Sequence, residues 1–138
     1  MLEIDNLTIP TLAEIVNNAY IDCEIDEDGD LYVTGLKIPL WVSVDVSDPS
    51  YRKIKFLTYV TFSDEENVDE LHALQLANSI NSSFLLNQVY VFGGRLWSVY
   101  YLLVADALSE KLFINTMQKS AESFVEGVRK LDEHNLIS

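Results

Sequence analysis

Only a few residues of this 138-residue chain are of a type and spacing that could support chemistry. The nearest approach to a metal site is the acidic turn Asp26-Glu27-Asp28-Gly29-Asp30. With Gly29 as the sixth residue of an EF-hand loop, the twelfth position should be Glu, but the chain has Gly35 there. The segments on both sides have the composition of strands, whereas an EF-hand needs helices. We therefore predict a solvated hairpin turn in which Gly29 is structural.

The candidate nucleophile and the candidate bases are poorly placed for catalysis. Cys23 lies between Asp22 and Glu24, and negative neighbours disfavour the thiolate that a reactive cysteine needs. His72 and His134 are the only histidines, and their positions match no zinc-binding spacing. The carboxylates fit turns and helix starts rather than a matched acid–base pair. We predict no catalytic residue, no metal and no cofactor, and hence a protein that is not an enzyme.

The charge of the chain argues against two classes of partner. It carries 22 acidic and 9 basic residues, which gives a formal net charge of −13. Such a surface repels nucleic-acid phosphates and anionic lipid, whereas it attracts a basic protein segment; the simpler interpretation is that acidity only maintains solubility. The chain has neither the basic start of a signal peptide nor an apolar run near the ~20 residues of a membrane helix. We expect a cytoplasmic protein that binds neither nucleic acid nor membrane.

Hydrophobic periodicity predicts the elements that position these residues. Helices are expected around residues 8–19, 63–82 and 109–134, and strands around residues 20–25, 31–34, 38–46, 53–62, 88–92 and 96–104. The links between strands are hairpin-like, and Gly93-Gly94 forms a tight turn that precedes no helix, so it is not a phosphate-binding loop. The sequence therefore predicts a single α+β domain over residues 1–138, with helices packed on an antiparallel sheet, in the order α-β-β-β-β-α-β-β-α.

The helix over residues 63–82 has a predicted start and a predicted buried side. The segment Ser63-Asp64-Glu65-Glu66 has the pattern of a capping box, and a weaker second start is available at residues 67–70. The side chains expected to be buried are Leu71, Leu74, Ala77 and Ile80. The same periodicity places Asn78 and Asn81 on the apolar side, where their amides need partners. We expect both to tie the helix end to nearby backbone, such as the start of the next hairpin; contact with a ligand is the alternative.

The strand over residues 96–104 is apolar on both faces. Trp97, Val99, Tyr101 and Leu103 alternate with Leu96, Ser98, Tyr100, Leu102 and Val104, and in the second row only the serine is polar. Since a strand covered on one side normally alternates apolar with polar residues, this strand needs cover on both sides. We predict that a partner subunit or a client segment contacts Leu96, Ser98, Tyr100, Leu102 and Val104, together with Trp41 and Tyr59. Alternatively, helices of the chain itself cover both sides.

Several of these features resemble the YbjN-like family, which has the fold of type III secretion chaperones. They are the acidic turn at residues 26–30, the helix segment Leu76-Ala77-Asn78-Ser79-Ile80-Asn81, the Gly93-Gly94 hairpin and the closing helix from Ser109. The last strand is longer and more aromatic than the family pattern. Members of the family are candidate regulators of sensory or stress responses, and better-known proteins of this fold are small, acidic, dimeric chaperones that bind extended client segments. The resemblance implies no cofactor and no catalytic residue.

Two functions follow as hypotheses. The first is a non-enzymatic protein-interaction module, chaperone-like or regulatory, that acts as a homodimer and binds a protein partner. The second is a small-molecule-binding domain whose pocket is lined by aromatic side chains, drawn from Trp41, Tyr59, Trp97, Tyr100 and Tyr101. The identity of the partner is not encoded in any motif of the chain.

Overall fold

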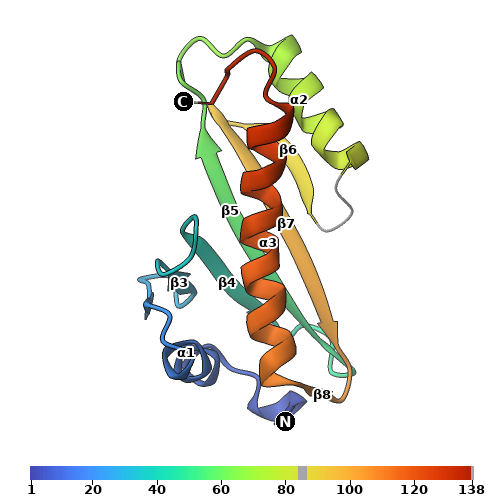
Figure 1. Ribbon diagram of the computed structural model, residues 1–138. Coiled ribbons are helices and arrows are strands. Elements are labelled where there is room, and N and C mark those ends of the chain that lie inside the picture. Colours follow the sequence, from blue (N-terminus) through green and yellow to red (C-terminus); the bar gives the residue numbers. More distant parts are fainter. Residues whose placement is uncertain (84–86, 138) are drawn as a thin grey trace.

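The computed structural model describes residues 1–83 and 87–137 and has the predicted α+β fold (Figure 1). Its main sheet is antiparallel and six-stranded, in the order β2-β3-β4-β5-β7-β6. The strands are β2 (Cys23–Ile25), β3 (Leu31–Val33), β4 (Leu40–Asp45), β5 (Arg52–Thr61), β6 (Gln88–Phe92) and β7 (Arg95–Val104), and the helices are α1 (Ile9–Asn18), α2 (Glu70–Ser83) and α3 (Glu110–Leu131). A short ribbon pairs β1 (Leu2–Glu3) with β8 (Ala107–Leu108), and a 3-10 turn, η1, spans Ile4–Asn6. The order of helices and main strands is the predicted one.

All three helices pack on the same face of the main sheet, which we call the covered face (Figure 1). In the figure α3 runs along the length of the long strands β5 and β7, while α1 and α2 lie at opposite ends of the molecule. The side chains beneath them form two hydrophobic clusters: one joins α1 to the first half of α3, and the other joins α2 to its second half. The opposite face of the sheet, which we call the open face, has no helix of the described residues over it.

The strand after the first helix starts later than predicted. The Tyr20 N–H donates to the Asn17 carbonyl at 3.0 Å, and the Ile21 N–H donates to the Val16 carbonyl at 3.2 Å. These two bonds close a Schellman turn at the end of α1, in which Tyr20 adopts a φ of +61° where glycine is usual. Tyr20 and Ile21 therefore form the turn that ends α1, and β2 begins at Cys23.

The second helix also starts later than predicted. It begins at Glu70, where Asp69 Oδ1 accepts the His72 N–H at 3.3 Å. The capping box predicted from Ser63 is therefore wrong. The Ser63 backbone N–H instead donates to the Leu136 carbonyl at 2.8 Å, so long-range pairing with the C-terminal tail replaces the local cap.

The buried side of α2 differs from the predicted stripe. The buried side chains are Ala73, Leu76, Ala77 and Ile80, whereas Leu71 and Leu74 are exposed. This side of the helix packs against both β6 and α3. Because small side chains allow helices to approach closely, the two alanines occupy the interface and the two leucines face outward.

The last helix forms as the sequence predicts. Ser109 caps α3, its Oγ accepting the Leu112 N–H at 3.2 Å. The side chains that α3 buries against the sheet include Phe113, Met117 and Phe124. The Gly93-Gly94 turn also forms as predicted: φ is +61° at Gly93 and +74° at Gly94, as a tight primed turn requires. Gly29 in the acidic turn likewise has a positive φ, +83°.

Asn81 joins α2 to the edge strand β6. Its Nδ2 donates to the Val89 carbonyl at 2.9 Å, and its Oδ1 accepts the Val89 N–H at 2.7 Å. This is the tie to the following hairpin that the sequence predicts for Asn81. The predicted placement of Asn78 on the apolar side of the helix is wrong, because Asn78 is exposed.

Asn81→Ala is expected to lower the free energy of unfolding by about 1–2 kcal/mol, because the N–H and C=O of Val89, a buried residue of β6, lose their hydrogen-bond partners. The matched control is Asn78→Ala, which is expected to change it by less than about 0.5 kcal/mol. Urea unfolding followed by circular dichroism measures both. Equal effects of the two substitutions would show that the helix–strand tie does not stabilise the fold.

Candidate functional site

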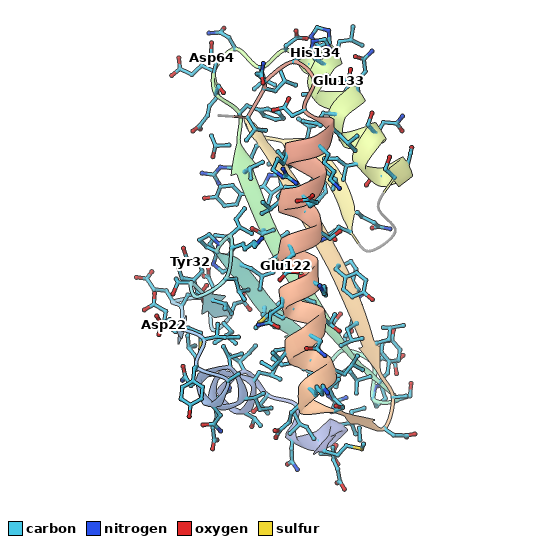
Figure 2. All side chains as sticks on the ribbon, in the orientation of Figure 1. Asp22, Tyr32, Asp64, Glu122, Glu133 and His134 are labelled. Atoms are coloured by element: carbon cyan, nitrogen blue, oxygen red, sulfur yellow. The ribbon has the colours of Figure 1, made fainter. Side chains whose placement is uncertain are left out.

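The open face carries a continuous row of aromatic rings, one from each of β3, β4, β5, β7 and β6. The ring centroids are 4.8 Å apart for Tyr32 and Trp41, 5.7 Å for Trp41 and Tyr59, 4.8 Å for Tyr59 and Trp97, and 6.3 Å for Trp97 and Tyr90. Figure 2 labels Tyr32, which forms the β3 end of the row. Because each such pair contributes about 0.5–1.5 kcal/mol, the rings form a preorganised surface.

The antiparallel register explains why these rings meet. Tyr32 is directly opposite Trp41, Tyr59 is opposite Trp97, and Trp97 is opposite Tyr90. Since side chains alternate between the two faces of a strand, aligned residues on neighbouring strands must share a face. Sequence patterning shows each ring on its own strand, but only the pairing of the strands makes them one row.

Large apolar side chains extend the row along β6 and β7. Tyr90, Phe92, Tyr101 and Leu103 are all exposed. A sheet face that meets only water normally carries polar residues at such positions. Contiguous exposed apolar surface of this kind is typical of interaction sites.

Two cations lie over the rings of the open face. The Arg95 guanidinium carbon is 4.2 Å from the centroid of the Tyr59 ring and 5.8 Å from that of Trp97. The Lys53 Nζ is 5.0 Å from the centroid of Tyr101. Both distances to the nearest ring lie within the ~6 Å of a cation–π interaction. The aromatic rings of the open face therefore already form cation–π contacts with side chains of the same chain.

A groove of about 300 Å³ crosses the aromatic row. It is lined by Asp26, Asp28, Asp30, Trp41, Leu57, Tyr59, Arg95 and Trp97. The acidic turn forms one side of it, and Asp26 Oδ1 shapes this turn by accepting the N–H groups of Asp28 (3.0 Å) and Asp30 (2.9 Å). Burial raises the pKa of Asp30, and the neighbouring charges of Asp26 and Asp28 raise it further. The groove therefore concentrates negative charge beside aromatic rings.

The structure places the predicted partner-contacting residues on both faces. Trp41 and Tyr59 lie on the open face, in the aromatic row. Leu96, Ser98 and Val104 are buried on the covered face, and Tyr100 and Leu102 pack partly against the first hydrophobic cluster there. The prediction that this second row of β7 meets another chain is therefore corrected, because helices of the same chain cover it. The uncovered row of β7 is the one that contains Trp97, Tyr101 and Leu103.

The aromatic pocket predicted as an alternative is formed in part. Trp41, Tyr59 and Trp97 line the groove. Tyr100 instead lies beneath the helices, 6.3 Å from the ring of Phe56, and Tyr101 lies on the open face beside Lys53. The alternation along the strand shows both rows, but it does not indicate that the row of residues 97, 99, 101 and 103 is the uncovered one.

Cys23 is placed as a structural thiol. Its Sγ lies 3.4 Å from Asn17 Oδ1 and 3.7 Å from the Ala13 carbonyl, both on α1. Burial raises the pKa of the Cys23 thiol, and the nearby charge of Asp22 raises it further. The thiol form therefore dominates at neutral pH, as the sequence neighbours indicate.

The two histidines, far apart in the sequence, come together in the fold. Their rings stack with centroids 3.7 Å apart, and His72 Nδ1 lies 2.6 Å from Asp69 Oδ2. Hydrogen bonding from the His72 backbone N–H lowers the pKa of Asp69, to which the charges of His72 and His134 add. Figure 2 shows His134 and Glu133 at the end of the molecule that carries the C-terminal tail. In the described part of the chain, no group of three or more His, Cys, Asp or Glu side chains is placed to hold a metal ion.

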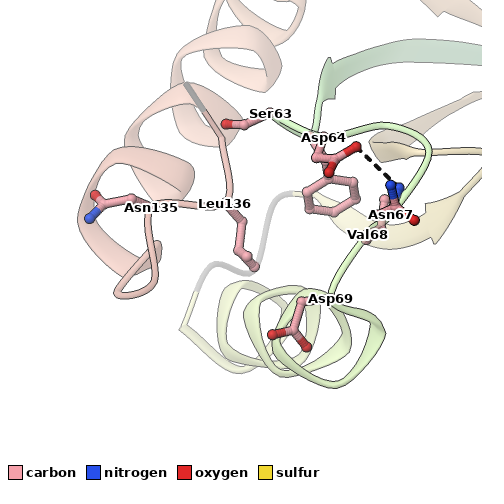
Figure 3. A pocket seen from close by; sticks show the side chains of 8 residues that line it. Ser63, Asp64, Asn67, Val68, Asp69, Asn135 and Leu136 are labelled. Carbon is pink, nitrogen blue, oxygen red and sulfur yellow. Dashed lines mark hydrogen bonds between the residues drawn. The ribbon is translucent and has the colours of Figure 1, made fainter.

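A second cavity, of about 150 Å³, lies between the segment after β5 and the C-terminal tail (Figure 3). Its carboxylates are already used in local structure: Asp64 Oδ1 accepts the Asn67 N–H at 3.2 Å, and Asp69 caps α2. The tail itself is held by Asp132, whose two oxygens accept the N–H groups of Leu136 and Ile137 at 2.8 Å each. This cavity therefore lies where the C-terminal tail meets the segment between β5 and α2, and its carboxylates serve local structure. The open face is the better candidate site.

None of the helices in residues 1–83 and 87–137 combines the length and apolarity needed to cross a bilayer.

No protein-family model matches the sequence, and no functionally curated protein matches it. The fold is similar to a crystal structure of YbjN from E. coli, a candidate transcription regulator. That match has a TM-score of 0.63 at 16% sequence identity and covers 94% of each chain. A likeness at this identity shows the fold alone, and it confirms the YbjN-like fold expected from the sequence.

Proposed function

We propose that this protein is a non-enzymatic interaction module that binds a partner protein through the open face of its sheet. The observation that carries the proposal is the uncovered aromatic row, which continues into the exposed side chains of Tyr101, Leu103 and Phe92. Aromatic residues dominate the binding energy of protein interfaces, because they bury large areas at a low cost in conformational entropy. A rigid row of five rings supplies such anchors without needing to rearrange.

The charge of the chain favours a basic partner over a second copy. Each copy carries a formal net charge of −13, so two copies repel each other at long range. A basic surface would be attracted instead, and association would accelerate at low ionic strength, since screening acts beyond about 8–10 Å at physiological salt. The sequence also predicts a homodimer, and this prediction is independent of the basic partner. A chaperone-like or regulatory role for partner binding is likewise a separate prediction.

The test compares two leucines of equal exposure on different surfaces. Leu103 on the open face is 65% exposed, and Leu71 on the outer side of α2 is 64% exposed. The protein is used as bait in a lysate of its source cells, the recovered protein is purified, and its dissociation constant is measured for wild type, Leu103→Asp and Leu71→Asp. We expect Leu103→Asp to weaken binding at least about ten-fold, because the interface loses the apolar contact of the leucine and must desolvate a carboxylate in its place. We expect Leu71→Asp to change it less than about two-fold.

Retained binding in Leu103→Asp, or equal loss in both variants, would refute the open face as the partner surface. Both variants must first show the thermal midpoint of wild type, because only then does a loss of affinity report on the surface. Light scattering of the same samples tests the homodimer. A wild-type dimer that Leu103→Asp converts to a monomer would identify a second copy, rather than a basic partner, as the occupant of this face.

A further inference from the structure

The groove on the open face has three properties that define the chemistry of a ligand. Both tryptophans of the chain, Trp41 and Trp97, line it, and Tyr59 lies between them in the aromatic row. Three carboxylates, from Asp26, Asp28 and Asp30, line the same groove. Aromatic faces and carboxylates both attract cations, the first through the ring quadrupole and the second through charge.

No ion pair of the described residues includes the three carboxylates, although the charge of Lys55 acts on Asp30 from a greater distance. Among the described residues, the carboxylates within 4.0 Å of a lysine or arginine nitrogen belong to Asp5, Asp45, Glu122 and Glu126. None of these lines the groove. Burial contributes most to the raised pKa of Asp30, the charges of Asp26 and Asp28 raise this pKa further, and the charge of Lys55 lowers it only in part. A cation arriving from a partner would relieve the repulsion among these carboxylates.

Arg95 shows that a guanidinium fits these rings. Its guanidinium carbon lies 4.2 Å from the Tyr59 centroid and 5.8 Å from the Trp97 centroid, and it has no carboxylate partner among the described residues. A planar, weakly hydrated guanidinium stacks on aromatic faces more favourably than a compact ammonium. The chain therefore already holds one arginine over the Tyr59 and Trp97 rings of the row.

We infer that the groove binds an arginine side chain from a basic segment of the partner, with its guanidinium against the aromatic row and its charge compensated by Asp28 and Asp30. This inference rests on the proposed function, since it names what the open face recognises. The carboxylates set the requirement for a cation, and the rings set the preference for arginine over lysine. Arg95 competes for the same surface from within the chain.

Tryptophan fluorescence gives a direct test, because both tryptophans line the groove. The probes are two octapeptides of equal charge, one alternating glycine with arginine and the other alternating glycine with lysine. We expect the arginine peptide to change the fluorescence saturably and to bind at least about five-fold more tightly than the lysine peptide at ~0.15 M salt. Equal affinity of the two peptides, or no saturable change with either, would overturn the inference.

Two neighbouring residues of the acidic turn provide a matched pair of variants. Asp28 lines the groove, whereas Glu27 is exposed and does not line it. Asp28→Asn and Glu27→Gln each remove one negative charge from the same turn. We expect Asp28→Asn to weaken binding of the arginine peptide about five- to ten-fold and Glu27→Gln less than about two-fold. Equal effects would show that only the long-range field of the acidic protein attracts the peptide, which would contradict a site.

Arg95→Gln is expected to act in the opposite direction. It removes the internal cation, so the arginine peptide should bind about three-fold or more tightly. Weaker binding in this variant would show that Arg95 recruits an anionic group and would overturn the inference. If the peptides fail but Leu103→Asp still abolishes partner binding, the proposed function stands and only the arginine recognition is refuted.

Discussion

Leu96→Asp is expected to abolish folding, whereas Leu103→Asp, on the same strand, should leave the free energy of unfolding within about 0.5 kcal/mol of wild type. The two residues are of one type and lie on opposite faces of β7. Leu96 is fully buried in the cluster beneath α2 and α3, and Leu103 is 65% exposed on the open face. The comparison therefore measures which face of the strand the helices cover.

The size of the expected effect follows from desolvation. An aspartate at position 96 would have to ionise in an apolar cluster or remain protonated with unmet hydrogen bonds, and it would also lose the burial of the leucine. Each of these effects amounts to several kcal/mol, and together they approach the ~5–15 kcal/mol that stabilises a domain of this size. Circular dichroism and urea unfolding provide the measurement. A folded Leu96→Asp protein with a wild-type midpoint would contradict the covered face described above.

Phe113→Ala and Phe124→Ala are each expected to lower the free energy of unfolding by about 3–5 kcal/mol. Both side chains project from α3, but they belong to different hydrophobic clusters. Phe113 packs against Phe56, with ring centroids 5.8 Å apart, beside the helix α1. Phe124 packs with Ile80 of α2 and Leu96 of β7.

These two variants also test the single domain predicted over residues 1–138. Because α3, β5 and β7 pass through both clusters, we expect loss of either ring to shift one cooperative transition. Tryptophan fluorescence and far-ultraviolet circular dichroism should then give coincident unfolding curves for each variant. Two separated transitions, with the earlier one in different halves for the two variants, would show that the clusters unfold as independent units.

A buried polar contact between the two clusters illustrates what local patterning does not reveal. Asn87 Nδ2 donates to Ser98 Oγ at 2.7 Å and to the Ser120 carbonyl at 3.0 Å, so it links β7 to α3. Ser98 is visible in the sequence only as an interruption in an apolar row, and Asn87 carries no local signal at all. Their roles arise because Ser98 and Ser120 are brought together from distant parts of the chain, where each polar group then needs a partner.

Features that depend only on neighbouring residues can be predicted from the sequence. The cap at Ser109, the Gly93-Gly94 turn and the alternation along residues 96–104 are each encoded within a few positions, and the order of elements follows from them. Where a long-range contact competed with a local signal, the local signal was overridden: Ser63 pairs with Leu136 instead of capping α2.

Which apolar face of β7 is covered depends on where the helices pack. The two-residue period of a strand assigns Leu96 and Trp97 to opposite faces of β7. Because the rows on both faces are apolar, the period does not indicate which row is buried. The choice is made where the helices dock, because all three lie on one side and bury the row of Leu96. The open face exists for the same reason: strands from the whole chain align their aromatic residues on the side that no helix of the described residues covers.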